Sequence, residues 1–214
     1  MKLDYEWVIY SHRPHRWQPI AAEAIVRLCP ETIRLTVIRE PGTAAMNLNR
    51  GLDICRSRYL FLMDEDCILK QVGWVGAMLA MTGKPDFGIG GCQEALTEED
   101  AAALPPTAEH GPVVRVVRQP GYVHLIDTMR CKGLRFDEKC PGASGMTDID
   151  ICAQARIVKG LGVYRNNGAF VYHQVKVDED SWRRANHHDL WTDMQKWYPE
   201  QVKYMDSKWG AGNW

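Results

Sequence analysis

Three carboxylates follow directly on an apolar run in the stretch YLFLMDEDCILK, residues 59–70. Adjacent like charges repel one another, so three acids beside a buried strand indicate a positively charged ligand. In an extended backbone, residues i and i+2 point the same way, which directs Asp64 and Asp66 to one side and Glu65 elsewhere. Two carboxylates that face one point suit a hard divalent cation such as Mg²⁺ or Mn²⁺. A solvated acidic turn, or a cap for a following helix, is the alternative interpretation.

Alternating strand and helix patterns surround these acids. Compact apolar runs at residues 7–10, 33–38 and 59–63 predict strands. Between them, apolar residues at helical spacing predict two helices, the second of which begins after a capping residue, Thr43. Strands that alternate with helices are typical of a parallel sheet wrapped by helices. Ligands of such sheets bind beyond the carboxyl ends of the strands, which is where the three acids are expected.

The second half of the chain has a different pattern. Residues 92–112 are acidic and interrupted by prolines, which indicates a surface excursion or flap rather than a linker between domains. The later runs VVRVV and YVHLIDTM resemble paired strands, and TDIDICAQARIVKG predicts a helix that is capped by Thr147 and ends near Gly160. A tail rich in Trp, His and Tyr predicts one more helix, around His187 to Trp197.

The composition is that of an ordinary globular protein. A chain of 214 residues with 45% hydrophobic and 25% charged residues can bury one sizeable core. The net charge of -1 gives no overall field that would attract nucleic acid or an anionic membrane. Seven cysteines without a C-x-x-C pair argue against a disulfide framework and a thiolate zinc site, and fit a reducing compartment. We therefore expect a cytoplasmic protein with no signal peptide and no transmembrane segment.

Two segments resemble a known enzyme family, the family 2 type glycosyltransferases with the GT-A fold. The nucleotide-binding half of that family resembles TVIREPGTAAMNLNRGLDICRSRYLFLMDEDCIL, with a strand, an acidic turn, an N-x-G element at Asn49 to Gly51 and a strand that ends in D-x-D. The acceptor half resembles GLRFDEKCPGASGMTDIDICAQARIVKGLGVYRNNGAFVYHQ, with a G-x-x-F-D-E segment, a glycine-rich loop, an acidic helix start and a histidine that closes a strand. Together the matches cover most of residues 7–175.

The resemblance implies an α/β chain with the GT-A, Rossmann-like fold. In that fold, helices flank a mostly parallel central sheet, and a small β element lies on the acceptor side. We expect residues 1–214 to form a single domain of this kind. Its nucleotide-sugar-binding half would span about residues 1–91, its acceptor and catalytic half about residues 113–175, and its C-terminal helix and tail about residues 176–214.

The resemblance also implies a metal and nucleotide site. Asp66 would bind a metal directly, Asp64 would face the ribose or reach the metal through water, and His173 would complete the metal shell. Carboxylates with a neutral imidazole suit Mn²⁺ or Mg²⁺, although a histidine at a strand end can also be structural. The residues expected to bind the nucleotide sugar are Ser11, Arg13, Glu40, Asn49, Asp64 and Glu65.

For the acceptor side, the resemblance implies Asp148 as the general base. It matches the second member of the family's Glu-Asp pair, whereas Thr147 replaces the Glu. Thr147 and Asp150 are expected to contact the acceptor. A carboxylate in the first turn of a helix is also stabilised by the helix dipole, so Asp148 can be interpreted as a capping residue instead, and Asp150 as an extension of the acidic first turn. An in-line displacement with Asp148 as the base would invert the anomeric centre.

The resulting hypothesis is a metal-dependent transfer of a sugar from a UDP- or GDP-sugar to a hydroxyl, with Mn²⁺ or Mg²⁺ as cofactor. The acceptor stays open among a glycan, a lipid-linked intermediate, a protein and a modified nucleic-acid base. A sugar nucleotidyltransferase would need a glycine-rich basic loop after the first strand, and SHRPHRW contains no glycine. A non-catalytic carbohydrate or nucleic-acid binder would use the aromatic and basic residues but not both acid clusters.

Overall fold

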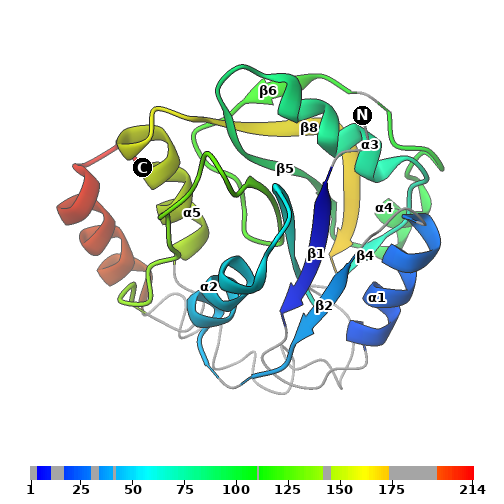
Figure 1. Cartoon of the computed structure of the whole chain (residues 1–214), viewed down its shortest axis with the longest axis horizontal. Helices are drawn as coiled ribbons and strands as arrows, with labels where there is room; N and C mark the ends of the chain where they lie inside the picture. The colour runs from blue at the N-terminus through cyan, green and yellow to red at the C-terminus, as the bar shows by residue number, and fades with distance from the viewer. Residues whose placement is uncertain are drawn as a thin grey trace.

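A mixed sheet of eight strands organises the computed structural model, which describes residues 4–10, 17–29, 34–40, 42–109, 111–141, 146–173 and 197–214 (Figure 1). The strands are β1 (Tyr5–Tyr10), β2 (Leu35–Ile38), β3 (Tyr59–Asp64), β4 (Cys67–Leu69), β5 (Phe87–Ala95), β6 (Val113–Arg115), β7 (Val123–Asp127) and β8 (Gly162–His173). They follow the order β2-β1-β3-β7-β5-β8-β4, and β6 pairs with β8 outside this path. Five strands run in one direction, while β4, β6 and β7 run against their neighbours.

Helices cover both faces of this sheet. They are α1 (Trp17–Leu28), α2 (Ala44–Ile54), α3 (Trp74–Leu79), α4 (Glu98–Ala102) and α5 (Thr147–Ala153), with a 3-10 turn η1 (Ala80–Gly83) and a π-helical turn η2 (Gln154–Val158). A further helix spans residues 197–209. One core contains side chains of α1, α3 and α4, and the other contains side chains of α2 and α5, so these two groups lie on opposite faces (Figure 1).

Strand β1 shows why the central strands are apolar on both faces. Its side chains alternate between the two cores: Trp7 and Ile9 enter the core beneath α1, and Val8 enters the core beneath α2. The Trp7 ring stacks on that of Phe61 in β3, with the ring centroids 4.4 Å apart. Burial on both faces is the expected state for the middle of a sheet that helices cover on each side.

The strand directions bring the candidate site residues to one edge of the sheet. The carboxyl ends of β1, β3, β5 and β8 lie there, together with the amino ends of the antiparallel strands β4 and β7. In register, Tyr10 is opposite Asp64, and Cys67 is opposite His173. Residues distant in sequence therefore meet where ligands of open α/β sheets bind.

Several sequence predictions are confirmed. Strands form within the first three predicted runs, and Thr43 caps α2 by accepting a hydrogen bond from the Met46 N–H at 3.3 Å. The helix predicted to end near Gly160 ends as α5 at Ala153 and continues as the π-helical turn η2 to Val158, two residues before Gly160. Gly160 has a φ of 67°, a conformation that suits glycine. The helix predicted around His187 lies outside the described residues, apart from Trp197 at its end.

Other predictions need correction. Thr147 is the first residue of α5 and not its cap: Met146 occupies the cap position and makes no side-chain hydrogen bond there. The strands β6 and β7 both form, but they pair with β8 and with β3 and β5 rather than with each other. The excursion at residues 92–112 begins with the end of β5 and contains α4. Cap geometry and strand partners depend on tertiary contacts that a local pattern does not encode.

Gly51 lets α2 approach the sheet closely. A Cβ added at this position would lie 2.7 Å from Leu62 Cδ2 and 3.2 Å from Val8 Cγ1. Both neighbours are buried, so neither can move away without disturbing the core. The glycine of the N-x-G element is thus a packing requirement.

We expect Gly51→Ala to lower the free energy of unfolding by about 1–3 kcal/mol, because overpacking outweighs the gain in helix propensity. Gly76→Ala in α3 is the matched control, since a Cβ there would meet no atom within 4 Å. That control should be neutral or stabilise the protein by up to about 1 kcal/mol. Urea unfolding of both variants measures the difference, and equal effects would contradict the role assigned to Gly51.

Candidate active site

The acidic turn is fixed by the segment that leads into β7. Strand β3 ends at Asp64, and a two-residue turn joins it to Cys67 at the start of β4. The Asp64 N–H donates to the Tyr122 carbonyl at 3.0 Å, and the Cys67 thiol donates to the same oxygen at 3.6 Å. Asp64, Glu65 and Asp66 are half-buried. The turn therefore has a defined backbone position although its three side chains repel one another.

His173 supplies positive charge to this acidic cluster. It is the last residue of β8 and is buried, with Nε2 3.4 Å from Asp66 Oδ1 and Nδ1 2.9 Å from Glu94 Oε2. Burial lowers its pKa, but hydrogen bonds to Asp66 and Glu94 and the charge of Asp64 raise it more, to about 9. Without a bound cation, an imidazolium thus offsets part of the negative charge; a metal ion would replace that proton.

The donor atoms at this point fit a divalent cation. A carboxylate oxygen of Asp66, Sγ of Cys67 and a ring nitrogen of His173 all lie within 4.8 Å of one another. Carboxylate and imidazole suit Mn²⁺, whereas a thiolate adds affinity for softer ions. Cys67 is a residue that the sequence pattern does not single out, because a cysteine that starts an apolar strand resembles an ordinary core residue.

Asp148 lies against the same segment that fixes the acidic turn. A Cβ added at Gly121 would lie 3.1 Å from Asp148 Cβ and 3.4 Å from its Oδ2, so the two residues are in close contact. Gly121 directly precedes Tyr122, whose carbonyl accepts the Asp64 N–H. The two acid clusters of the sequence are therefore connected through two adjacent residues.

The environment of Asp148 suits a proton acceptor near neutral pH. Burial raises its pKa to about 6, while backbone hydrogen bonds, including one from Gly121, and the charge of Arg118 lower it by less. A carboxyl with such a pKa is ionised at pH 7 and still basic enough to accept a proton in a transition state. The raised pKa is thus compatible with the predicted role of Asp148 as a general base.

Tyr122 also connects the acidic turn to His173. Its hydroxyl donates to the Cys92 carbonyl at 2.9 Å, and its ring centroid lies 5.5 Å from that of His173. Burial raises the pKa of the phenol above its ordinary value, so it stays protonated and remains a donor. No sequence signal marks this tyrosine, because its role depends on which strands become neighbours.

Asn49 joins α2 to the segment at residues 136–138. Its side-chain oxygen accepts from the Phe136 N–H at 2.9 Å, and its Nδ2 donates to the Phe136 carbonyl at 2.9 Å and to Glu138 Oε1 at 2.8 Å. Glu40 is exposed and forms an ion pair with Arg50 at 3.1 Å. Their predicted contacts with a nucleotide sugar remain predictions.

The two predicted acceptor contacts are buried. Thr147 begins α5, and Asp150 is fully buried with protein donors at both carboxylate oxygens. Trp209 Nε1 and Lys208 Nζ each lie 2.8 Å from Asp150 Oδ1, and Gln154 Nε2 donates to Oδ2 at 2.6 Å. Contact of either residue with an acceptor remains a prediction. Ser11 and Arg13 lie outside the described residues.

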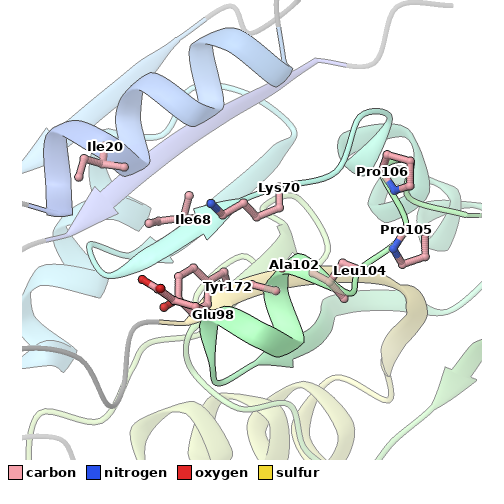
Figure 2. Close-up of a pocket in the computed structure, with 10 residues that line it drawn as sticks. Ile20, Ile68, Lys70, Glu98, Ala102, Leu104, Pro105, Pro106 and Tyr172 are labelled. Atoms are coloured by element: carbon pink, nitrogen blue, oxygen red, sulfur yellow. The ribbon is translucent and has the colours of Figure 1, made fainter.

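A groove of about 590 Å³ lies between α1, α4 and the β4–β8 pair (Figure 2). Most of its lining residues are apolar, and they come from α1, β4, α4, β8 and the loop at residues 104–106, with Lys70 and Glu98 as the charged members. Ile68 and Tyr172 belong to the lining, and each is next in sequence to a residue of the donor cluster.

No helix among the described residues has the length and apolar character needed to cross a bilayer.

No protein-family model matches the chain, and no curated protein matches its sequence. Solved structures share its fold. A mannosyltransferase from Pyrobaculum calidifontis in complex with GDP-Man and Mn²⁺ superposes with a TM-score of 0.62 at 9% identity, over 94% of this chain and 65% of that chain. The present chain thus spans less than two thirds of that protein's length.

Two further structures extend the comparison. Glucosyl-3-phosphoglycerate synthase from Mycobacterium tuberculosis, in complex with Mn²⁺, UDP-Glc and phosphoglyceric acid, gives a TM-score of 0.57 at 13% identity, over 91% of this chain and 79% of that chain. A197 from STIV gives 0.54 at 12% identity, over 83% and 87% of the respective chains. The glycosyltransferases among these structures have the GT-A fold, and the predicted fold class is confirmed.

The raised pKa of Asp148 makes its effect on stability depend on pH. A carboxyl whose pKa is higher in the folded chain stabilises the fold fully only below its unfolded pKa of about 3.9. That contribution is lost as the pH rises through about 6. Above this pH, the folded protein carries a charge in a place that disfavours it.

We therefore expect Asp148→Asn to raise the melting temperature at pH 8 by about 2–4 °C, because the neutral amide removes the buried charge. The gain should shrink toward pH 4. Glu23→Gln, at an exposed position of α1, serves as the control and should show no such pH dependence. Thermal unfolding followed at both pH values tests this, and a gain of equal size at pH 4 and pH 8 would contradict it.

Proposed function

We propose that this chain is a divalent-metal-dependent glycosyltransferase that moves a sugar from a nucleoside-diphosphate sugar to a hydroxyl acceptor. The observation that carries the proposal is the arrangement at one sheet edge. A donor cluster of Asp66, Cys67 and His173 lies there, and Asp148, with its pKa of about 6, is joined to it through Gly121 and Tyr122. Structures with the same fold, in complex with GDP-Man or UDP-Glc and Mn²⁺, support it.

Asp64, Asp66 and His173 would hold Mn²⁺ or Mg²⁺. When bound, such an ion offsets the negative charge that develops on the departing diphosphate. Glu94 has a supporting role, because it lies 2.9 Å from His173 Nδ1 and can accept a proton from it. That contact turns Nε2 toward Asp66 and keeps it available as a ligand.

Asp148 would accept the proton of the attacking hydroxyl. It lies in the first turn of α5 against Gly121, and its half-buried setting supports the proposal because it keeps the carboxylate weakly hydrated and basic. An in-line attack assisted by this base inverts the anomeric centre. Ser11, Arg13, Glu40, Asn49, Asp64 and Glu65 are the proposed nucleotide-sugar contacts, as in family 2 type enzymes.

The first test of the proposal is metal-dependent donor binding. We expect UDP- or GDP-sugars to raise the melting temperature of the wild-type protein in the presence of Mn²⁺ but not of EDTA, because a ligand that binds only the folded state stabilises it. Asp66→Ala should abolish this shift. Asp53→Ala is the control: it removes a carboxylate near the C-terminal end of α2 that pairs with Arg135, and it should leave the shift in melting temperature unchanged. An undiminished shift in Asp66→Ala would remove Asp66 from the metal site, and no shift in the wild type would count against the proposed donor class.

The second test separates binding from chemistry. We expect Asp148→Asn to bind the donor with Mn²⁺ as the wild type does, and to hydrolyse it or transfer its sugar about 10²–10⁴-fold more slowly, because the amide cannot accept the proton. Release of the nucleoside diphosphate measures the rate. Its pH profile in the wild type should fall on the acid side with an apparent pKa near 6. A rate close to that of the wild type would assign the base to another residue.

A further inference from the structure

The helix at residues 197–209 packs directly on α5 and on the loop before it (Figure 1). Met205 is fully buried against Met146, the residue at the α5 cap position, and against Cys140. Gln201 donates to the Pro141 carbonyl at 2.7 Å. The C-terminal helix therefore touches the chain on both sides of the glycine-rich loop, immediately before the helix that carries Asp148.

Two side chains of the C-terminal helix contact a buried carboxylate of α5. Trp209 Nε1 donates to Asp150 Oδ1 at 2.8 Å, and Lys208 Nζ lies 2.8 Å from the same oxygen. Asp150 is fully buried and belongs to the first turn of α5. A buried carboxylate needs such partners, because its charge would otherwise be uncompensated. The position of this turn is thus coupled to the C-terminal helix.

Lys208 also ties α5 to the acceptor segment. Its Nζ lies 2.6 Å from Asp137 Oδ2, and the Tyr204 hydroxyl donates to that oxygen at 2.6 Å. Burial lowers the pKa of Lys208, but its hydrogen bonds to Asp137 and Asp150 raise it more, so it remains charged. One ammonium group therefore links the segment before the glycine-rich loop with the helix after it.

The first turn of α5 has no side-chain cap at its start. Met146 provides no side-chain cap, and the helix passes after seven residues into the π-helical turn η2. Asp148 and Asp150 share this turn, two residues apart, with Asp150 anchored and Asp148 facing Gly121. Fixing Asp150 consequently fixes the direction in which the Asp148 carboxylate is presented.

We infer that Trp209 and Lys208 are positioning residues for Asp148, acting through Asp150 to hold the first turn of α5 in its reactive orientation. The inference rests on the proposed function, since it assigns these residues to the presentation of the proposed base. It differs from a general stabilising role, which would change the amount of folded protein without changing the rate per folded molecule.

The test compares two tryptophans of the same tail. Trp209→Phe keeps an aromatic ring but removes the N–H that binds Asp150. Trp214→Phe removes an equivalent bond to Asp206 Oδ1, at 2.7 Å, that does not reach α5. Two properties are measured for both variants. The first is the rate of hydrogen exchange of the α5 amides. The second is kcat and KM for hydrolysis of the UDP- or GDP-sugar that binds with Mn²⁺.

We expect Trp209→Phe to speed exchange in α5 and to lower kcat by on the order of tenfold to a hundredfold, with KM for the donor unchanged, because a small misorientation of a reacting group slows the chemical step. Trp214→Phe should alter neither quantity. Lys208→Met should behave like Trp209→Phe, whereas Lys208→Arg should retain most of kcat, because a guanidinium can still contact both carboxylates.

The inference would be overturned if Trp209→Phe and Lys208→Met showed the same α5 exchange rate and the same kcat as the wild type. It would also be overturned if Trp214→Phe lowered kcat as much as Trp209→Phe does. Faster α5 exchange with unchanged kcat would also overturn it, since the turn would then be held without any consequence for the base. If the wild type hydrolyses no donor, the proposed function fails, and the exchange data alone decide whether Trp209 and Lys208 hold α5.

Discussion

The carbonyl oxygen of Tyr122 is the contact on which the candidate site depends. It accepts the Asp64 N–H and the Cys67 thiol, so it fixes both ends of the acidic turn. The residue before it packs against Asp148. This geometry exists because β7 runs antiparallel between β3 and β5 and therefore starts at the edge where they end. Two adjacent residues, Gly121 and Tyr122, thus relate the acidic turn to the proposed base.

Two polar residues that the sequence predicts as ligand contacts also connect distant parts of the protein. Asn49 uses its whole amide on Phe136 and Glu138, and Asp150 is occupied by Trp209, Lys208 and Gln154. Buried polar groups need such partners, so these contacts stabilise the segments that they connect. The Asn49 contacts connect α2 to Phe136 and Glu138, and the Asp150 contacts connect α5 to the C-terminal helix.

Local patterns predict the parts of this structure that depend on local physics. The apolar runs at β1 and β3, the Thr43 cap and the glycine at Gly160 follow from residue type and spacing, and the meeting of Asp66 with His173 follows from the parallel sheet and the family resemblance. Cys67 and Tyr122 could not be predicted, because their roles arise from strand register between distant segments. The Thr147 cap is wrong for a related reason: the chain enters α5 in a conformation that packing of Met146, rather than a capping hydrogen bond, determines.

Strand β4 has consequences for the order of assembly. Among the described strands it pairs with β8 alone, and that pairing places Cys67 opposite His173, near the end of the sheet-forming sequence. During synthesis, the acidic turn is therefore made long before its histidine emerges from the ribosome. Pairings between such distant segments form late, because the entropy of closing the intervening chain must be overcome first. A cation that needs both Asp66 and His173 could then bind only after the sheet has formed. Its binding would stabilise the completed fold and would not nucleate folding.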